Sequence, residues 1–300
     1  MSRLQAGGGK ITARLHGAKV VFPELAYTYP LKLLSPRIED DSVAIVYTLS
    51  YGGGLVGGDR ISLSVDVGPG VKLLLLSQGS TKVFKTRPGT RRAVHHTQSD
   101  SPETRQRLHA RVSAGGALFL LPDPVTCFAS ASYAQIQTLE LERGASAVLL
   151  DWYTSGRRAR GEEWAFVRYR SVNEIWVDGV RVARDATLLE GDGQEGVDGL
   201  PRRTLGERMG PYACFACVLL CGPEVTKVVR SLDARVESES VLRLREPMRV
   251  VWAVSALNGA EGRVLRVAGK ETEDVKDWLR DALSGLGDAV GRDAYAKAFV

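Results

Sequence analysis

Ile61-Ser-Leu-Ser-Val-Asp-Val67 alternates apolar and polar residues over its whole length. Successive side chains of an extended chain point to opposite faces, so the pattern puts the apolar residues on one face of a strand and the polar residues on the other. Gly68-Pro-Gly70 then ends this strand. The run from Val71 to Leu76 is apolar almost throughout, which is typical of a strand covered on both faces. This part of the chain therefore predicts a layered β-structure.

Short apolar segments of the same kind fill the first 190 residues, interrupted by Gly, Pro, Asp or Ser. Helical spacing of apolar residues begins only after Gly222-Pro223, over residues 225–236, and returns over residues 272–286. The sequence therefore predicts a mostly β fold with a few helices gathered in the C-terminal third. The other expected strands are residues 43–49, 108–112, 117–121, 134–141, 146–152, 164–170, 174–177, 180–183, 213–221, 249–256 and 263–267.

Composition limits the class of protein. The 300 residues carry 40 basic and 35 acidic side chains, a net charge of +5 at pH 7, and 44% of them are hydrophobic. These are ordinary globular values, and the positive excess is too small to indicate nucleic-acid binding. The first residues lack the apolar segment of a secretory signal, and no uncharged stretch reaches the roughly 20 residues that span a bilayer. We therefore expect a cytoplasmic protein without a membrane segment.

Two motifs suggest a bound group at first sight. Gly52-Gly-Gly54-Leu-Val-Gly57 has the spacing of a dinucleotide-binding loop, but it leads into a strand, whereas that site needs a helix. A tight glycine turn is the better interpretation, and it leaves Asp59 at the end of a roomy loop. Cys214, Cys217 and Cys221 could supply thiolates to a metal, but they lie in an apolar strand that puts Cys214 and Cys217 on opposite faces. Buried free cysteines are therefore expected.

The remaining polar residues do not form a known catalytic motif. His95 and His96 are adjacent within a basic segment and would point to opposite sides, so a solvated loop is the favoured interpretation. Asp123 lies between two prolines that stiffen its turn. Glu162 follows three arginines, and a salt-bridged loop carboxylate is its simplest interpretation. Residues 191–210 are rich in Gly, Asp, Glu and Arg, which indicates an exposed loop insertion.

A series of segments between residues 15 and 190 is specific in its order and spacing. The segments are Tyr29-Pro-Leu-Lys-Leu-Leu34, Gly52-Gly-Gly-Leu-Val-Gly-Gly-Asp59, Gly79-Ser-Thr-Lys-Val-Phe-Lys85, Leu121-Pro-Asp-Pro-Val-Thr-Cys-Phe128 with Tyr133 and Gln135, Asp151-Trp-Tyr-Thr-Ser-Gly-Arg157, Arg160-Gly-Glu162 and Arg184-Asp185. The series resembles the urease accessory protein D family, called UreD, or UreH in some bacteria. The C-terminal third matches mainly in outline.

The resemblance implies one domain over residues 1–300, a β-helical stack of sheets with a few helices, and a loop insertion at residues 191–210. It also implies a maturation factor that is not an enzyme. Such a factor binds urease apoprotein and, with accessory proteins F and G (UreF and UreG), helps to install nickel. The resemblance further implies an internal water-filled passage, with nickel in transit and no permanently bound cofactor. Protein G is the GTPase of the set, which agrees with the missing phosphate-binding loop here.

A nickel passage needs oxygen or nitrogen ligands that replace part of the hydration shell and still release the ion. Scattered carboxylates meet this need better than a cage of thiolates, which would hold copper or zinc tightly. Our hypothesis is therefore that Asp59 and Glu162, with Ser80, Thr81 and Asp123, line the passage.

Two other functions stay open at this stage. The first is a β-helical carbohydrate-active enzyme with paired carboxylates such as Asp59 and Asp123, which would have to meet in one cleft. The second is a nucleic-acid module around the basic residues 82–92, which lack interleaved aromatic residues. For partner binding, amphipathicity and charge indicate the helix at 225–236, the late helix with Trp278, and the loop with Arg157, Arg158 and Arg160.

Overall fold

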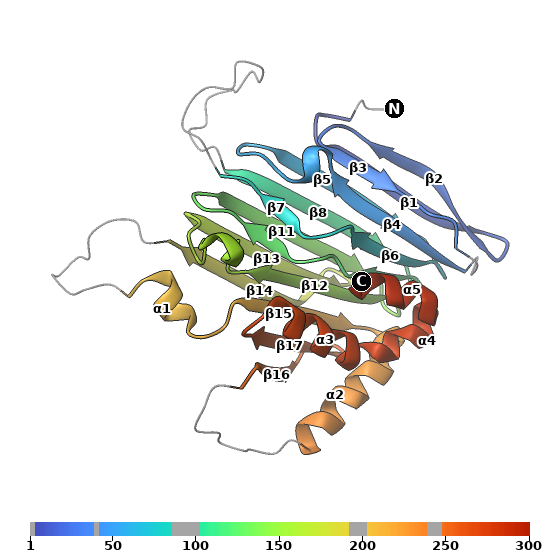
Figure 1. Ribbon diagram of the computed structural model, residues 1–300. Helices are drawn as coiled ribbons and strands as arrows, with labels where there is room; N and C mark the ends of the chain where they lie inside the picture. Colours follow the sequence, from blue (N-terminus) through green and yellow to red (C-terminus); the bar gives the residue numbers. More distant parts are fainter. Residues whose placement is uncertain (1–3, 39–41, 86–102, 192–202, 239–247) are drawn as a thin grey trace.

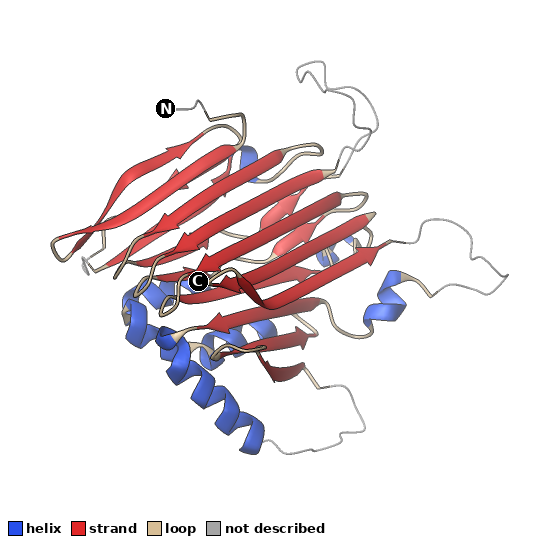
Figure 2. Ribbon diagram, turned by 180° about the vertical axis from the view of Figure 1, so that it is seen from behind, coloured by secondary structure: helices blue, strands red, loops and turns tan. Residues whose placement is uncertain are grey.

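The structure is a computed structural model, and it describes residues 4–38, 42–85, 103–191, 203–238 and 248–300. Two large β-sheets lie face to face, and the C-terminal helices cover the outer side of one of them (Figure 1). Within the described residues, the outer side of the other sheet carries no helix, as the view from behind shows (Figure 2). The expected mostly β fold with late helices is therefore confirmed.

The first sheet has seven strands in the order β14-β13-β11-β8-β5-β1-β2. Its inner five strands run parallel to one another, and the edge strands β2 and β14 are antiparallel to their neighbours. The strands are β1 (Gly8–His16), β2 (Lys19–Tyr27), β5 (Arg60–Val67), β8 (Thr104–Val112), β11 (Ser132–Leu141), β13 (Arg168–Val177) and β14 (Val180–Glu190).

The second sheet has ten strands, eight of them in the order β16-β17-β15-β12-β9-β6-β4-β3. The short strands β7 and β10 pair with each other, and β10 also pairs with β12. The ten strands are β3 (Leu31–Leu34), β4 (Val43–Ser50), β6 (Lys72–Ser77), β7 (Thr81–Val83), β9 (Ala117–Leu120), β10 (Val125–Cys127), β12 (Ser146–Thr154), β15 (Cys214–Cys221), β16 (Val250–Ala256) and β17 (Gly262–Gly269).

The chain alternates between the two sheets from β4 to β13 and therefore coils as a β-helix. Strands β4, β6, β9 and β12 stack in parallel in one sheet, while β5, β8, β11 and β13 stack in parallel in the other. Gly70, Gly115 and Gly144 occupy the same corner of successive coils at φ of 70°, 73° and 84°. Glycine adopts this left-handed backbone without a steric penalty, so it permits the sharp turn between the sheets.

Two hydrophobic layers hold the elements together. The first fills the space between the sheets and includes Ile11, Leu63 and Leu149. The second lies between the ten-stranded sheet and the helices, where Val275 and Leu279 of one helix are fully buried. The helices are α1 (Leu205–Met209), α2 (Thr226–Ser238), α3 (Thr272–Ala282), α4 (Gly287–Val290) and α5 (Arg292–Ala296), with short 3₁₀ helices η1 (Tyr51–Gly53), η2 (Arg158–Arg160), η3 (Pro223–Val225), η4 (Ser284–Leu286) and η5 (Lys297–Phe299).

One expected strand is wrong. Residues 164–170 were expected to be extended, but Trp164 has a φ of 54° and β13 begins only at Arg168. The rings of Tyr153 and Phe215 pack edge-on against buried Trp164, so tertiary packing overrides the local preference of this aromatic segment. The hairpin around Asp178-Gly179 is confirmed, with both residues at positive φ as its tight turn requires.

Other expectations have mixed outcomes. All four cysteines are free and buried, as expected, and Cys214 faces the helices while Cys217 faces the other sheet. His95 and His96, and residues 192–202 of the expected insertion, lie outside the described residues. Across the described ranges, no helix combines the length and apolar character needed to cross a membrane.

Candidate functional site: polar cavities between the sheets

A buried carboxylate stands at the centre of the polar groups between the sheets. Asp151 lies on β12 and is 6% exposed. Its Oδ2 accepts hydrogen bonds from Ser171 Oγ at 2.5 Å and Asn173 Nδ2 at 2.6 Å. Its Oδ1 accepts hydrogen bonds from Gln135 Nε2 at 3.0 Å and the Tyr169 hydroxyl at 3.3 Å. Four polar side chains of the facing sheet therefore surround one carboxylate of β12.

Strand alternation explains why these groups meet. Leu149, Asp151 and Tyr153 point from β12 toward the seven-stranded sheet, while the residues between them face the helices. On the facing sheet Gln135 of β11 and Ser171 of β13 are direct cross-strand neighbours. The register of the two parallel stacks thus forms a polar layer inside an otherwise apolar core.

Burial dominates the electrostatics of this layer. It raises the pKa of Asp151, against the hydrogen bonds from Ser171 and Asn173, which stabilise the charged form. The nearby carboxylate of Asp185 raises this pKa further. A cation beside Asp151 would lower this pKa, because a nearby positive charge favours the charged form of the carboxyl group.

The first cavity beside this layer, here called the Arg266 cavity, has a volume of about 300 Å³. Asp151, Asp185, Cys217, Trp252 and Arg266 are among the residues that line it. Arg266 Nη2 lies 2.7 Å from Asp185 Oδ1, so a guanidinium at the mouth of the cavity neutralises a largely buried carboxylate. Burial raises the pKa of the Cys217 thiol, which therefore stays protonated and is a poor metal ligand.

A smaller cavity of about 80 Å³, the Gln137 cavity, adjoins the other side of the polar layer. Thr81, Asp123, Gln137 and Asp151 are among its lining residues, so Asp151 is common to both cavities. Asp123 is held by Ser77, whose Oγ accepts the Asp123 backbone N–H at 2.7 Å and donates to Asp123 Oδ2 at 3.2 Å. Burial raises the pKa of Asp123 as well. The structure thus brings two residues of the predicted set to the polar layer.

A third cavity, the Ser155 cavity, has about 440 Å³ and is lined by Ser80, Asp123, Thr126 and Ser155, among others. The buried hydroxyl of Ser155 has no hydrogen-bond partner within the described part of the chain. A buried hydroxyl without a partner costs free energy, which a water or an ion in this cavity would recover. Ser80, Asp123 and Asp151 therefore belong to a series of cavities in which each shares a residue with the next.

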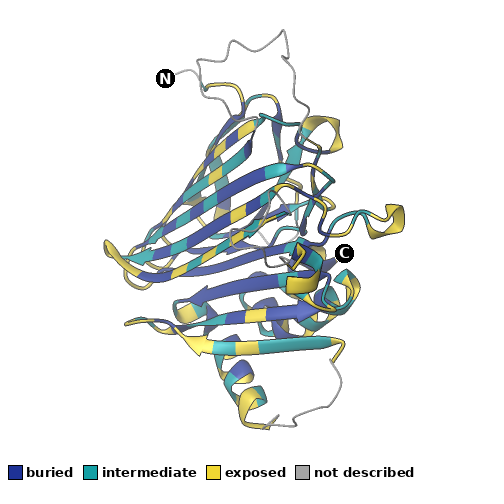
Figure 3. Cartoon of the chain, turned by 90° about the vertical axis from the view of Figure 1, so that its left-hand side faces the viewer, coloured by how far each residue is buried: buried dark blue, intermediate teal, exposed yellow. Residues whose placement is uncertain are grey.

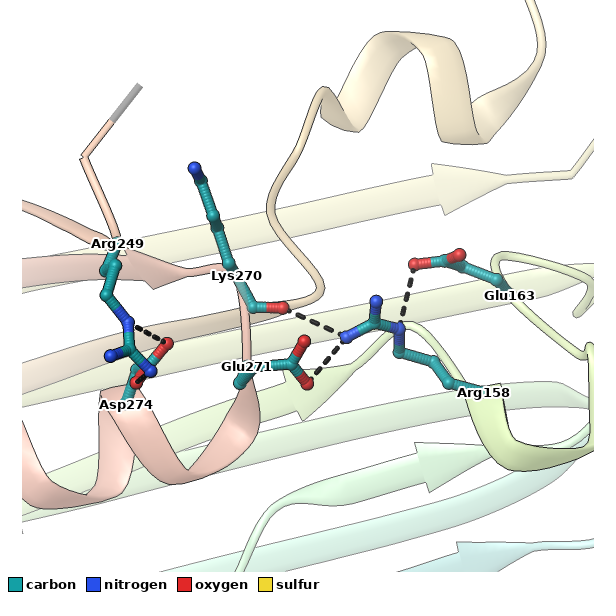
Figure 4. A network of polar contacts seen from close by, with 6 residues as sticks. All are labelled: Arg158, Glu163, Arg249, Lys270, Glu271 and Asp274. Atoms are coloured by element: carbon teal, nitrogen blue, oxygen red, sulfur yellow. Dashed lines mark hydrogen bonds and ion pairs between the residues drawn. The ribbon is translucent and has the colours of Figure 1, made fainter. Parts of the chain in front are cut away.

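Arg158, which lines the Ser155 cavity, contacts Glu163, Lys270 and Glu271 (Figure 4). Its Nη1 lies 2.6 Å from Glu271 Oε2 and donates to the Lys270 carbonyl at 3.1 Å, and its Nε lies 3.4 Å from Glu163 Oε1. The hydrogen bond with Glu271 raises the pKa of Arg158. This contact joins η2 to the start of α3 across the cavity mouth.

Asp59 and Glu162 do not line these three cavities. Asp59 Oδ2 accepts the Val56 backbone N–H at 2.8 Å, which closes the glycine-rich turn. The Glu162 carboxylate binds Arg157 and accepts the Ala129 backbone N–H at 3.2 Å, and these contacts lower its pKa, the Arg157 hydrogen bond first. Both residues thus have local structural partners.

A surface cavity of about 560 Å³, the Gly52 cavity, lies beside them. It is lined by Gly52 and Gly53 of the turn, by Arg157, and by Ser80, which also lines the Ser155 cavity. Glu162 is connected to this cavity only through Arg157, and Asp59 only through the glycine-rich turn that it closes.

Sequence reasoning missed Asp151 and Asp185 as site residues, although both stand in the motifs that carry the family resemblance. The available signal was the strand around Asp151, which is apolar on both faces. A carboxylate in such a strand must be buried, and buried carboxylates are held by polar partners. Within the described ranges, three or more His, Cys, Asp or Glu side chains nowhere form a group that could hold a metal ion.

Known proteins are similar in sequence to almost the whole chain. The family described as UreD urease accessory protein matches residues 6–299. Urease accessory protein 4 of Cryptococcus neoformans var. grubii is 38% identical, with 96% of this chain and 92% of that protein covered. UreD of Sorangium cellulosum is 39% identical over 98% of this chain and 84% of that protein. Urease accessory protein D of Arabidopsis thaliana is 32% identical over 96% and 99%.

These matches define the class as accessory factors of urease. The chain belongs to the UreD family of urease accessory proteins. It therefore has a role in urease maturation and is not itself an enzyme. The alternative of a carbohydrate-active enzyme falls with this assignment, and Asp59 and Asp123 line no common cavity among the four described above.

Proposed function

We propose that this chain binds urease apoprotein together with accessory proteins F and G, and that it conducts Ni²⁺ toward the urease active site through its polar cavities. The observation that carries the proposal is Asp151, a buried carboxylate between two cavities, surrounded by four polar side chains of the facing sheet. An apolar core would be simpler and at least as stable at this position. Transport of a cation would explain why polar groups are present at this buried position.

The proposed route follows the shared lining residues. Ni²⁺ enters at the Gly52 cavity or the Ser155 cavity, passes Ser80, Thr81 and Asp123, and reaches the Arg266 cavity beside Asp151. Asp59 and Glu162 act at the outer end, where they fix the glycine-rich turn and Arg157.

The chemistry of the lining suits transit. Carboxylates, hydroxyls and side-chain amides offer oxygen ligands that replace part of the hydration shell. Burial disfavours a free negative charge on Asp151, and a cation beside it would favour the charged carboxylate. The Cys217 thiol stays protonated, and the pairing of Arg266 with Asp185 limits the negative charge at the mouth. Each feature supports weak binding and release.

Partner binding rests on the family and on surfaces predicted from the sequence. Trp278 of α3 is only half-buried, and its ring lies 5.4 Å from that of Trp252 with Arg235 over it. Val236 of α2 is 46% exposed. This aromatic and apolar surface on the helical layer is the proposed contact for accessory protein F.

The test is co-expression of urease with its accessory proteins, with and without this chain, followed by nickel analysis and urea hydrolysis. We expect low nickel content without the chain. We also expect low nickel content with Asp123→Asn, which keeps the shape of the side chain and removes its charge. Asp66→Asn is the matched control, because Asp66 pairs with Arg14 on the outer sheet surface, away from the cavities. Full nickel content without the chain would refute the proposal.

The same assay tests the outer end with Asp59→Ala and Glu162→Ala. We expect reduced nickel content with both. Full nickel content would remove these two residues from the route, whereas reduced binding of the partner proteins would indicate a docking role for the same loop.

A further inference from the structure

The uncovered face of the seven-stranded sheet is divided into two electrostatically different ends. Buried positions alternate with less buried ones along β5 and along most of β11, as the burial colours illustrate (Figure 3). At the end of the face where β8 and β13 finish, cations are paired. Arg111 Nε lies 3.0 Å from Glu140 Oε2, and Arg184 Nε lies 3.4 Å from Glu174 Oε1. These contacts balance the charge there.

The opposite end of the same face is different. Arg60, Arg107 and Arg170 are exposed, and none has an acidic partner among the described residues. Arg60 is the direct cross-strand neighbour of Arg105, and only Ala134 separates Arg105 from Arg170 in the same row. Arg105 itself is paired, because its Nε lies 2.8 Å from Glu103 Oε2. Neighbouring strands are about 4.8 Å apart, and like charges at that spacing destabilise a sheet. Within the described ranges, this end of the sheet therefore carries three arginines, Arg60, Arg107 and Arg170, whose charge no ion pair balances.

An apolar row lies within this cluster of arginines. Ile136 and Val172 are cross-strand neighbours on β11 and β13, and Val172 is only 7% exposed. Leu188 of β14 is 53% exposed and lies in the next row, as the cross-strand neighbour of Arg170. Val172 is outside both hydrophobic core clusters, so it belongs to the outer surface, shielded by its neighbours. Apolar residues surrounded by arginines are typical of protein–protein contact regions. The arginine face consists of Arg60, Arg107, Arg170, Ile136, Val172 and Leu188.

We propose that the arginine face docks an acidic surface of urease apoprotein, with its apolar row at the centre of the contact. This inference rests on the proposed function and names the surface through which one partner binds. Charge complementarity selects the occupant: acidic side chains would pair with Arg60, Arg107 and Arg170, and a protein surface would cover the exposed side chain of Leu188. Nucleic acid fits less well, because none of the aromatic residues in β5, β8, β11 and β13, all of which the structure describes, is exposed for bases to stack on.

The test measures the affinity of the full chain for purified urease apoprotein. The combined variant Arg107→Glu with Arg170→Glu should bind at least about tenfold more weakly, because close charge pairs across an interface couple this strongly. The matched control, Arg111→Glu with Arg184→Glu, makes the same charge change at the paired end and should bind like the wild type. Leu188→Ser should weaken binding without changing its salt dependence. Circular dichroism and thermal unfolding confirm that each variant is folded.

The outcomes are distinct. If the wild type binds and the Arg107/Arg170 variant binds equally well, the inference is wrong and the proposed function stands. Equal weakening by the control variant also overturns it, because the effect would then be one of net charge. If the wild type does not bind urease apoprotein at all, the proposed function fails and the inference fails with it. Loss of binding to a DNA oligonucleotide, with urease binding intact, would assign the face to nucleic acid instead.

Discussion

Replacing Asp151 separates the structural from the electrostatic part of the buried polar layer. Asp151→Ala removes the acceptor of four hydrogen bonds. Gln135 and Asn173 each retain a second contact with Ser171 Oγ, at 3.3 and 3.4 Å, whereas Tyr169 and Ser171 lose their acceptor. Two buried donors without partners cost about 1–3 kcal/mol each, and water from the adjoining cavities recovers part of this. We expect a loss of about 2–4 kcal/mol in the free energy of unfolding.

Asp151→Asn keeps the shape of the side chain and one acceptor oxygen. It should therefore lower the free energy of unfolding by less than Asp151→Ala does, by about 1 kcal/mol near neutral pH. The difference between wild type and this variant should depend on pH. Burial raises the pKa of Asp151 in the folded state above its value in the unfolded chain. The raised pKa therefore adds to the stability of the folded state only while Asp151 is protonated. This contribution is complete below the pKa of the unfolded chain and is lost as the pH rises through the higher pKa of the folded state.

Urea denaturation followed by tryptophan fluorescence at several pH values measures these differences. The advantage of wild type over Asp151→Asn should be greatest at acidic pH and should shrink by at most about 1.4 kcal/mol per pH unit. A constant difference across the acidic and neutral range, or an Asp151→Ala protein as stable as wild type, would refute this description of the polar layer.

Three further predictions concern other parts of the chain. Gly222→Ala should lower the free energy of unfolding, measured by urea denaturation, by about 3 kcal/mol or more. The φ of Gly222 is +96°, and the new Cβ would lie 2.2 Å from the Ala145 carbonyl oxygen. An unchanged denaturation midpoint would contradict this prediction. All four thiols should resist alkylation at pH 8 until denaturant is added, because burial raises the pKa of even Cys221 to about 11; rapid native labelling would be inconsistent with it. Arg263→Ala should lower the free energy of unfolding by less than about 1 kcal/mol, because the ion pair of Arg263 with Asp233 is partly exposed. A larger loss that does not change with salt concentration would contradict this prediction.

The central part of the fold was predictable from the sequence because its strands carry clear patterns. The alternation of residues 61–67 and the continuous apolar run after Val71 give β5 and β6 almost to the residue. The first three strands were missed. Strand β1 has glycines and cations among its apolar positions, and β2 contains Pro23, which an edge strand tolerates. Their stability comes from pairing with distant strands, which a local pattern does not report.

The candidate site was predictable only in part. Ser80 and Asp123 lie in loops and Thr81 begins the short strand β7, so these polar residues are easily noticed in the sequence, and all three line the cavities. Asp151 was not predicted as a site residue because the pattern of its strand is typical of an apolar core strand. Its partners Gln135 and Ser171 come from other coils of the β-helix, and only the register of the parallel strands brings them together.

The most direct test of nickel conduction is the nickel content of urease that has matured with Asp151→Asn in place of the wild-type chain. The variant keeps the fold and the outer surfaces, so complexes with urease and the accessory proteins should form normally while nickel per urease active site falls severalfold. Normal nickel content with the intact complex would contradict conduction through the polar layer.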